Sequence, residues 1–270
     1  MAIISISREV GSLGDEIAKA VTEKLGYEHI EKSQISQALS EHGFLASDVD
    51  KFDEKKPSIW QILSKQKSLF DHLIRSTVYD FAARDNVVIV GRGAQMILKG
   101  IPGTLHVRIT APYDARVHRI MEQMEYEELK AERLIRLSDR ESSGYISTYF
   151  DADWDDSIPY DLVINTRNLT LNTVVDLITE AAKSIEIKKV PQTSETLKDL
   201  ALTQKGKAVL LEMGGIEVAN LVVERGVATL SGMARSLEAK EECKYAILNV
   251  KGIAEVDNQL NVPPENYFVG

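Results

Sequence analysis

The chain opens with Ala2-Ile-Ile-Ser-Ile-Ser7 and continues with Arg8-Glu-Val-Gly-Ser-Leu-Gly14. The first stretch is short, apolar and rich in β-branched residues, which is typical of a buried parallel strand. A helix is predicted to begin near Asp15, because apolar residues then recur on one face until Gly26 ends the pattern. The order strand, glycine loop, helix predicts an anion site, because the N–H groups at a helix start point outward.

The alternation of strand and helix continues as far as about residue 185. Further strands are predicted at 86–90, 104–109 and 160–165. The predicted helices cover most of 31–85, with a polar interruption at 48–57, and then about 113–125, 127–148 and 171–182. Strands separated by helices favour an α/β fold, in which helices flank a parallel sheet on both sides.

The pattern changes after residue 187. Residues 188–194 are polar and contain Pro191, which is typical of a linker. Residues 195–264 then predict helix, strand, strand, helix and strand, with the first two strands turning at Arg225-Gly226. We therefore expect a small αββαβ domain at this end, large enough to fold alone.

Composition and charge limit the classes of protein to consider. Of the 270 residues, 44% are hydrophobic and 27% charged, the balance of an ordinary globular protein. The formal net charge of −9 argues against nucleic-acid binding through a general positive field. No run reaches the ~18 apolar residues of a membrane span, and nothing resembles a signal peptide. We therefore expect no stable membrane insertion. Cys243 is the single cysteine, so no disulfide can form within the chain, and we expect a cytoplasmic protein.

The glycine loop is the first candidate site. Gly11 and Gly14 would let a phosphate approach the backbone closely, and Ser12 could donate its hydroxyl. The full P-loop pattern G-x-x-x-x-G-K-[ST] is absent, because Asp15 stands at the lysine position and Glu16 at the hydroxyl position. Both acids also suit the first turn of a helix, and an ordinary turn is the alternative to a phosphate loop. We assign no metal-ligating residue.

Arginines form the second candidate site. Eight of the thirteen lie between Arg84 and Arg140, and a planar guanidinium suits phosphate. Arg92 directly follows a predicted strand, so it should project into the same crevice as the glycine loop. Other arginines fall on one face of each of two later helices: Arg116 and Arg119, then Arg133, Arg136 and Arg140. They could close over phosphates as a mobile lid, or belong to solvated helices paired with nearby glutamates.

Four segments in order resemble the cytidylate kinase-like family: Ile6 to Ile17, Val88 to Ala94, Ala111 to Ile120 and Tyr160 to Thr166. The resemblance covers about residues 1–185. It implies a P-loop NTPase-like nucleoside monophosphate kinase with a helical lid, ATP–magnesium as phosphoryl donor, and CMP or dCMP as acceptor.

The resemblance also implies roles for individual residues. The loop would bind nucleotide, Arg92 would meet the acceptor phosphate, and four arginines would act from the lid. The loop residues are Arg8, Gly11, Ser12, Gly14, Asp15 and Glu16, and the lid residues are Arg116, Arg119, Arg133 and Arg140. The family's loop commonly reads G-S-G-G-R-E-I, so Asp15 replaces a basic residue, and Ser142 stands where the family often has arginine. Both changes remove positive charge, which leaves a catalytically impaired nucleotide-binding regulatory protein as the alternative function.

Residues 195–264 resemble a BON domain. The matching features are the hairpin from Val222 to Gly232 and the closing segment from Val250 to Leu260. We therefore expect a cytidylate kinase-like domain at 1–187, a linker at 188–194 and a BON domain at 195–264. The BON domain is expected to regulate, bind a ligand or partner, or form homo-oligomers, and a lipid-binding role is the alternative.

Overall fold

The computed structural model describes residues 2–40, 64–186, 192–213 and 216–263. These residues form two compact units. The first lies within Met1–Lys55 and Arg84–Thr193, and the second within Lys56–Ala83 and Ser194–Gly270. The predicted polar interruption at 48–57 and most of the predicted linker lie outside the described residues.

The first unit is built on a parallel sheet of five strands in the order β2-β3-β1-β4-β5. The strands are β1 (Ile3–Arg8), β2 (Glu28–Ile30), β3 (Val87–Val90), β4 (Thr104–Thr110) and β5 (Leu162–Asn165). This confirms the predicted α/β fold with its P-loop kinase-like sheet. The sequence analysis missed β2, which has only three residues and no apolar alternation.

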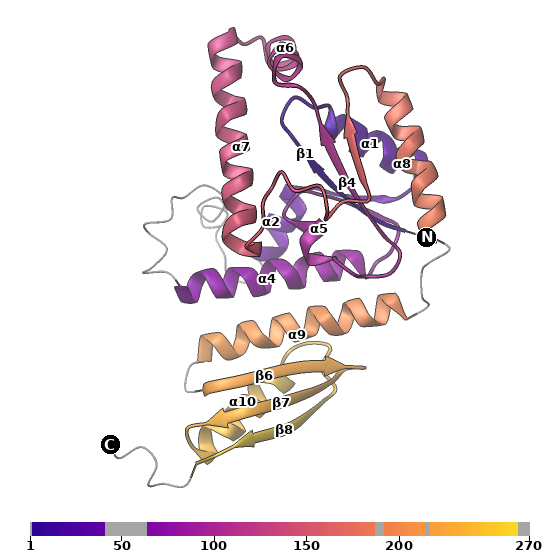
Figure 1. Cartoon of the computed structure of the whole chain (residues 1–270). Helices are drawn as coiled ribbons and strands as arrows, with labels where there is room; N and C mark the ends of the chain where they lie inside the picture. The colour runs from indigo at the N-terminus through magenta and orange to yellow at the C-terminus, as the bar shows by residue number, and fades with distance from the viewer. Residues whose placement is uncertain (1, 41–63, 187–191, 214–215, 264–270) are drawn as a thin grey trace. The chain divides into compact units, whose positions relative to one another are not determined.

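Helices cover this sheet and extend beyond it (Figure 1). They are α1 (Gly14–Leu25), α2 (Lys32–Ser40), α5 (Ala94–Ile97), α6 (Tyr113–Met124), α7 (Glu128–Phe150) and α8 (Leu171–Glu186). One core joins α1 and α8 to the strands through residues such as Ile4, Ile17 and Ile178. Ile3 and Ser5, which alternate with Ile4 along β1, are equally buried. The central strand is therefore covered on both faces, as its apolar sequence predicts.

The predicted helix pair after β4 is α6 followed by α7. Their facing sides form a separate small core of Val117, Ile120, Ala131 and Ile135. The apolar faces read from the sequence therefore pack on each other.

The second unit contains a mixed three-stranded sheet in the order β6-β7-β8. Its elements are α9 (Thr193–Met213), β6 (Ile216–Glu224), β7 (Val227–Ala234), α10 (Leu237–Leu248) and β8 (Glu255–Asn261). The αββαβ order matches the prediction. The turn at Arg225 and Gly226 has positive φ at both residues, and Asp199 accepts both of their backbone N–H groups.

The second unit also includes α4 (Ser64–Ala82), which precedes β3 in the sequence. Asp80 on α4 pairs with Lys205 on α9 at 2.6 Å, and His72 meets Gln204 at 2.8 Å. The sequence predicted this helix but gave no sign of its contact with α9. None of the helices described is both long enough and apolar enough to cross a membrane.

Candidate functional site

A cavity of about 190 Å³ opens where β1 and β3 end. It is lined by residues from five segments of the first unit: Ser7, Arg8, Lys32, Val90, Gly91, Arg92, Gly93, Gln95, Ser138, Glu141, Ser142, Tyr145, Ile146 and Trp154. Three of these side chains are cationic, and Glu141 is the one carboxylate in this described lining. Ligands of open parallel sheets bind beyond the carboxyl ends of the strands, so the cavity lies where the fold predicts a ligand.

Arg92 reaches this cavity from the loop after β3. The sequence predicted that it shares a crevice with the glycine loop, of which only Arg8 lines the described cavity. Its side chain is buried, and Nη2 lies 3.4 Å from Ser36 Oγ on α2. Arg8 approaches from the end of β1, and a Cβ on Gly91 would lie only 3.0 Å from Arg8 Nη1. Position 93 also requires glycine, because the Phe150 ring occupies the space of a Cβ and the Gly93 φ is 66°. The two arginines therefore meet from neighbouring strands.

The far wall of the cavity comes from α7. Ser138, Glu141, Ser142 and Tyr145 line it, and the Tyr145 hydroxyl lies 3.4 Å from the Arg92 carbonyl oxygen. Ser142, one of the two departures from the family pattern, is thus a cavity residue. An arginine there would add a fourth positive charge to the lining.

The glycine loop lies beside this cavity but contributes only Arg8 to its lining. Gly11, Ser12, Gly14, Asp15 and Glu16 are absent from the described lining residues. A Cβ on Gly11 would lie 2.8 Å from the Arg116 carbonyl oxygen, and one on Gly14 would meet the Arg8 side chain. These glycines allow the chain to pack closely on itself.

Three polar residues of the loop are bonded within the protein. Arg8 Nε donates to Asp15 at 2.8 Å, and Gln123 on α6 donates to Glu16 at 2.9 Å. Ser12 Oγ donates to the Glu9 carbonyl oxygen at 2.7 Å. The acids at the P-loop lysine and hydroxyl positions therefore take part in local pairs.

Leu13 is a departure that the sequence analysis missed. It precedes α1 with a φ of 66°, the left-handed region that favours glycine. The family pattern G-S-G-G has glycine at this position, so a leucine here adopts a backbone conformation that suits glycine better.

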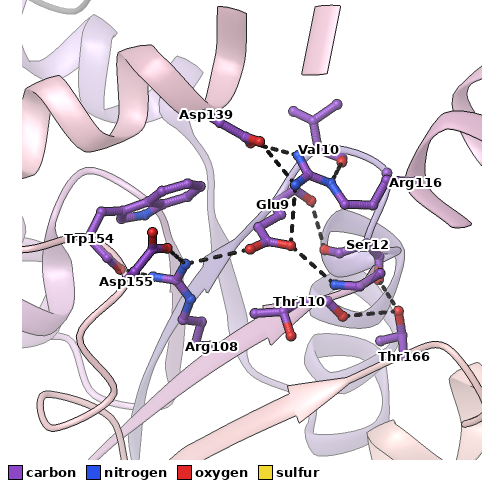
Figure 2. Close-up of polar contacts among 12 residues, drawn as sticks. Glu9, Val10, Ser12, Arg108, Thr110, Arg116, Asp139, Trp154, Asp155 and Thr166 are labelled. Carbon is purple, nitrogen blue, oxygen red and sulfur yellow. Dashed lines mark hydrogen bonds and ion pairs between the residues drawn. The ribbon is translucent and has the colours of Figure 1, made fainter. Parts of the chain in front are cut away.

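Glu9 joins two buried arginines beside the loop (Figure 2). Its carboxylate lies 3.5 Å from Arg108 Nη2 and 3.4 Å from Arg116 Nη1, and it accepts the Ala111 N–H at 3.1 Å. Arg116 also binds Asp139 at 2.6 Å, and Arg108 binds Asp155 at 2.9 Å. The result is a row of alternating charges, Asp155–Arg108–Glu9–Arg116–Asp139, here called the Glu9 network.

The predicted lid arginines separate into two groups. Arg116 belongs to the Glu9 network and donates Nε to the Val10 carbonyl oxygen, while Arg119 donates to Gly11 and Thr166. Thr166 in turn donates to the Ser12 carbonyl oxygen. Arg119 therefore stabilises the glycine loop both directly, through Gly11, and through Thr166. Arg133 and Arg140 are exposed on α7, and neither lines the described cavity.

The sequence analysis missed Glu9, Arg108, Asp139 and Trp154 as site residues. Arg108 had a readable signal, since a charged residue inside the apolar run 104–109 has to be paired when the strand is buried. The other three acquire a role only through side chains that meet in three dimensions.

The family implies magnesium-bound ATP, but the loop does not fit a triphosphate in the P-loop manner. Asp15 and Glu16 add negative charge at the positions where a P-loop has a lysine and a hydroxyl residue. Among the described residues, no three His, Cys, Asp or Glu side chains gather as a metal site. The loop lacks the lysine that a P-loop provides for the donor phosphates.

A family model described as the cytidylate kinase-like family matches residues 3–168, more than half of the chain. The chain belongs to this family. A second model, the BON domain, matches residues 198–264. The cytidylate kinase of Haloarcula marismortui is 30% identical over 186 residues, which cover 67% of this chain and 90% of that protein. The cytidylate kinase of Archaeoglobus fulgidus is 28% identical over 189 residues, covering 69% and 96%.

A solved structure supports the fold of the first unit. The crystal structure of an uncharacterized protein from Eubacterium ventriosum matches with a TM-score of 0.53 at 22% identity. The match covers 68% of this chain and 99% of that one. At this identity the likeness concerns the fold alone.

Proposed function

We propose that the first unit binds a nucleoside monophosphate in the cavity at the carboxyl ends of β1 and β3. The observation that carries this proposal is the meeting of Arg8, Lys32 and Arg92 in one lining that holds a single described carboxylate. Guanidinium groups bind phosphate oxygens through paired, charge-assisted hydrogen bonds. CMP or dCMP is the acceptor that membership of the cytidylate kinase-like family suggests.

Two uses of this binding site are candidates. The first is ATP-dependent phosphorylation of the bound monophosphate, supported by family membership and by the similarity to cytidylate kinases over nearly their whole length. The second is nucleotide binding without transfer, with the BON domain reporting occupancy. The second is favoured by the glycine loop, whose acids stand in place of the lysine and hydroxyl residue.

In the first use, this chain's residues would act by positioning and charge neutralisation, which phosphoryl transfer requires more than covalent help. Arg92 and Arg8 would hold the acceptor phosphate, and α7 would shield it from water. ATP with magnesium would supply the transferred group only if residues other than a P-loop lysine hold its phosphates.

Binding and turnover are measured separately on the full chain. Titration calorimetry with CMP and dCMP tests the binding site, and absence of heat with every nucleoside monophosphate would sink the proposal. A coupled assay with ATP, magnesium and the same monophosphates then separates the two uses. Diphosphate formation supports the kinase, whereas binding without turnover supports the second candidate.

Asp15→Arg sharpens this choice because it restores the family's basic residue in the loop. If the wild type binds without turnover, the second candidate expects this variant to gain activity. If the wild type is already an active kinase, little gain is expected. Asp176→Asn, which alters an exposed pair with Lys24 on another part of the surface, is the matched control.

A further inference from the structure

Arg108 is a buried cation that the proposed phosphate contacts do not use. It is 4% exposed on β4 and is absent from the described lining of the cavity. A buried guanidinium persists only when its contacts compensate for lost hydration. The identity of those contacts therefore indicates what Arg108 holds in place.

Most contacts of Arg108 go to two adjacent residues (Figure 2). Nη1 donates to the Trp154 carbonyl oxygen, Nη2 binds Asp155 at 2.9 Å, and Cζ lies 4.5 Å from the centre of the Trp154 ring. Glu9 faces the same guanidinium from the glycine loop at 3.5 Å. One buried side chain thus fixes both the backbone and the ring of Trp154.

Trp154 is also part of the cavity wall. Trp154, which is 8% exposed, therefore shares this lining with Arg8, Lys32 and Arg92. A cavity with cationic groups and a large aromatic ring complements a ligand that has a phosphate and a flat base. The Arg108 guanidinium lies over one face of the indole, so a base would have to stack on the opposite face.

We propose that Trp154 is the base-stacking residue of the cavity and that Arg108 is the positioning residue that holds its ring. This inference rests on the proposed function, since it takes the ligand to be a nucleoside monophosphate. It adds that the base contributes to affinity through an aromatic contact, separately from the phosphate.

The test compares two ligands on the full chain by titration calorimetry. CMP carries phosphate, sugar and base, whereas ribose 5-phosphate lacks the base. The wild type is expected to bind CMP at least about fivefold more tightly, the lower end of the range for base–aromatic stacking. Trp154→Leu should remove most of this difference, leave ribose 5-phosphate binding within about twofold, and thereby show that the fold is intact. Trp154→Phe should keep most of the difference.

Arg108→Gln tests the positioning role. It should reduce CMP binding toward the value for ribose 5-phosphate while leaving the phosphate-only ligand bound, a selectivity that general loss of folding cannot produce. If this variant fails to fold, the two Trp154 variants still decide the stacking role. Tyr126→Leu is the matched control, because its ring pairs with Lys130 at 3.6 Å and does not line the described cavity.

The outcomes separate this inference from the function on which it rests. Equal wild-type affinity for CMP and ribose 5-phosphate, or equal weakening of both by Trp154→Leu, would overturn the stacking role and leave monophosphate binding standing. Unchanged CMP binding in Trp154→Leu would do the same. Binding of neither ligand by the wild type would overturn both proposals.

Discussion

The two sides of β1 treat positive charge in opposite ways. Toward β3, Arg8 and Arg92 line a cavity whose described wall holds one carboxylate, and Arg8 also binds Asp15 outside that lining. Toward β4, Arg108 and Arg116 are bound by Glu9, Asp139 and Asp155 in the Glu9 network (Figure 2). Arginine at the carboxyl end of a strand is therefore not in itself a phosphate site. Arg108 and Arg116 each meet two carboxylates and support the fold, whereas Arg92 lines a cavity that can hold a ligand.

Glu9→Gln disrupts the Glu9 network on the β4 side and should have the largest effect on stability. Removing the carboxylate leaves two buried guanidinium groups partly uncompensated, so the free energy of unfolding should fall by roughly 3 kcal/mol. Urea denaturation measures this change. Asp176→Asn, which removes the charge from an exposed ion pair, should cost less than about 1 kcal/mol. Equal losses in the two variants would contradict a structural role for the Glu9 network.

Arg92→Ala removes charge from the β3 side. The affinity for CMP should fall by about 2 kcal/mol, roughly thirtyfold, because a charge-assisted hydrogen bond to phosphate is lost. Arg92→Lys should recover only part of this, since lysine lacks the planar fork. Calorimetry measures the CMP affinity of both variants. Arg84→Ala is the control, because this exposed arginine pairs with Glu28 at the amino ends of β2 and β3, away from the cavity. A normal CMP affinity in Arg92→Ala would place the phosphate elsewhere.

The third prediction concerns His106, a buried residue of β4 that contacts the central strand β1. Burial lowers the pKa of His106 below its ordinary 6.5, against an opposing effect of Asp161, and Ser5 Oγ on β1 lies 2.7 Å from its Nδ1. The folded state therefore binds the proton less readily than the unfolded chain. Stability should be complete above pH 6.5 and fall as the pH drops below it, by at most about 1.4 kcal/mol per pH unit. Urea denaturation at pH 7.5 and 5.5 should show a smaller difference in His106→Gln than in the wild type.

Leu13 gives the smallest expected effect and concerns the loop between the two sides. Leu13→Gly and Leu13→Ala both lose the packing of the leucine side chain, so their comparison isolates the backbone. Because φ is 66°, the glycine variant should be about 1 kcal/mol more stable than the alanine variant. Thermal unfolding measures the order, and a more stable alanine variant would show that the loop relaxes out of this conformation.

The elements with strong local signals were predictable from the sequence. The apolar run of β1, the loop before α1, Arg92 after β3 and the αββαβ order near the C-terminus depend on composition and spacing within a few residues. β2 was not predictable, since three residues with one buried side chain give no period. The strand forms because it pairs with β3, and each pair of facing residues is 59 positions apart in the sequence.

The candidate site was predictable only in part, for the same physical reason. Helical spacing correctly grouped Arg116 with Arg119, but it could not show that Asp139 and Thr166 bind them. Spacing gives the face of a helix, whereas the partner of a charge depends on which segments meet. Ion pairs such as Arg108–Asp155 join residues whose separation has no sequence pattern.

The strand order also has a consequence for synthesis of the chain. β1 is made first, but its neighbours begin at Val87 and Thr104, and the cavity residue Trp154 comes later still. At about 5–20 residues per second, Trp154 leaves the ribosome roughly 7 to 30 s after Arg8. Until Val87 and then Thr104 are made, β1 has no partner strand in its sheet, and open edges are where strands pair wrongly. Among the five strands of this sheet, the central strand β1 thus has the longest interval between its own synthesis and that of its partners.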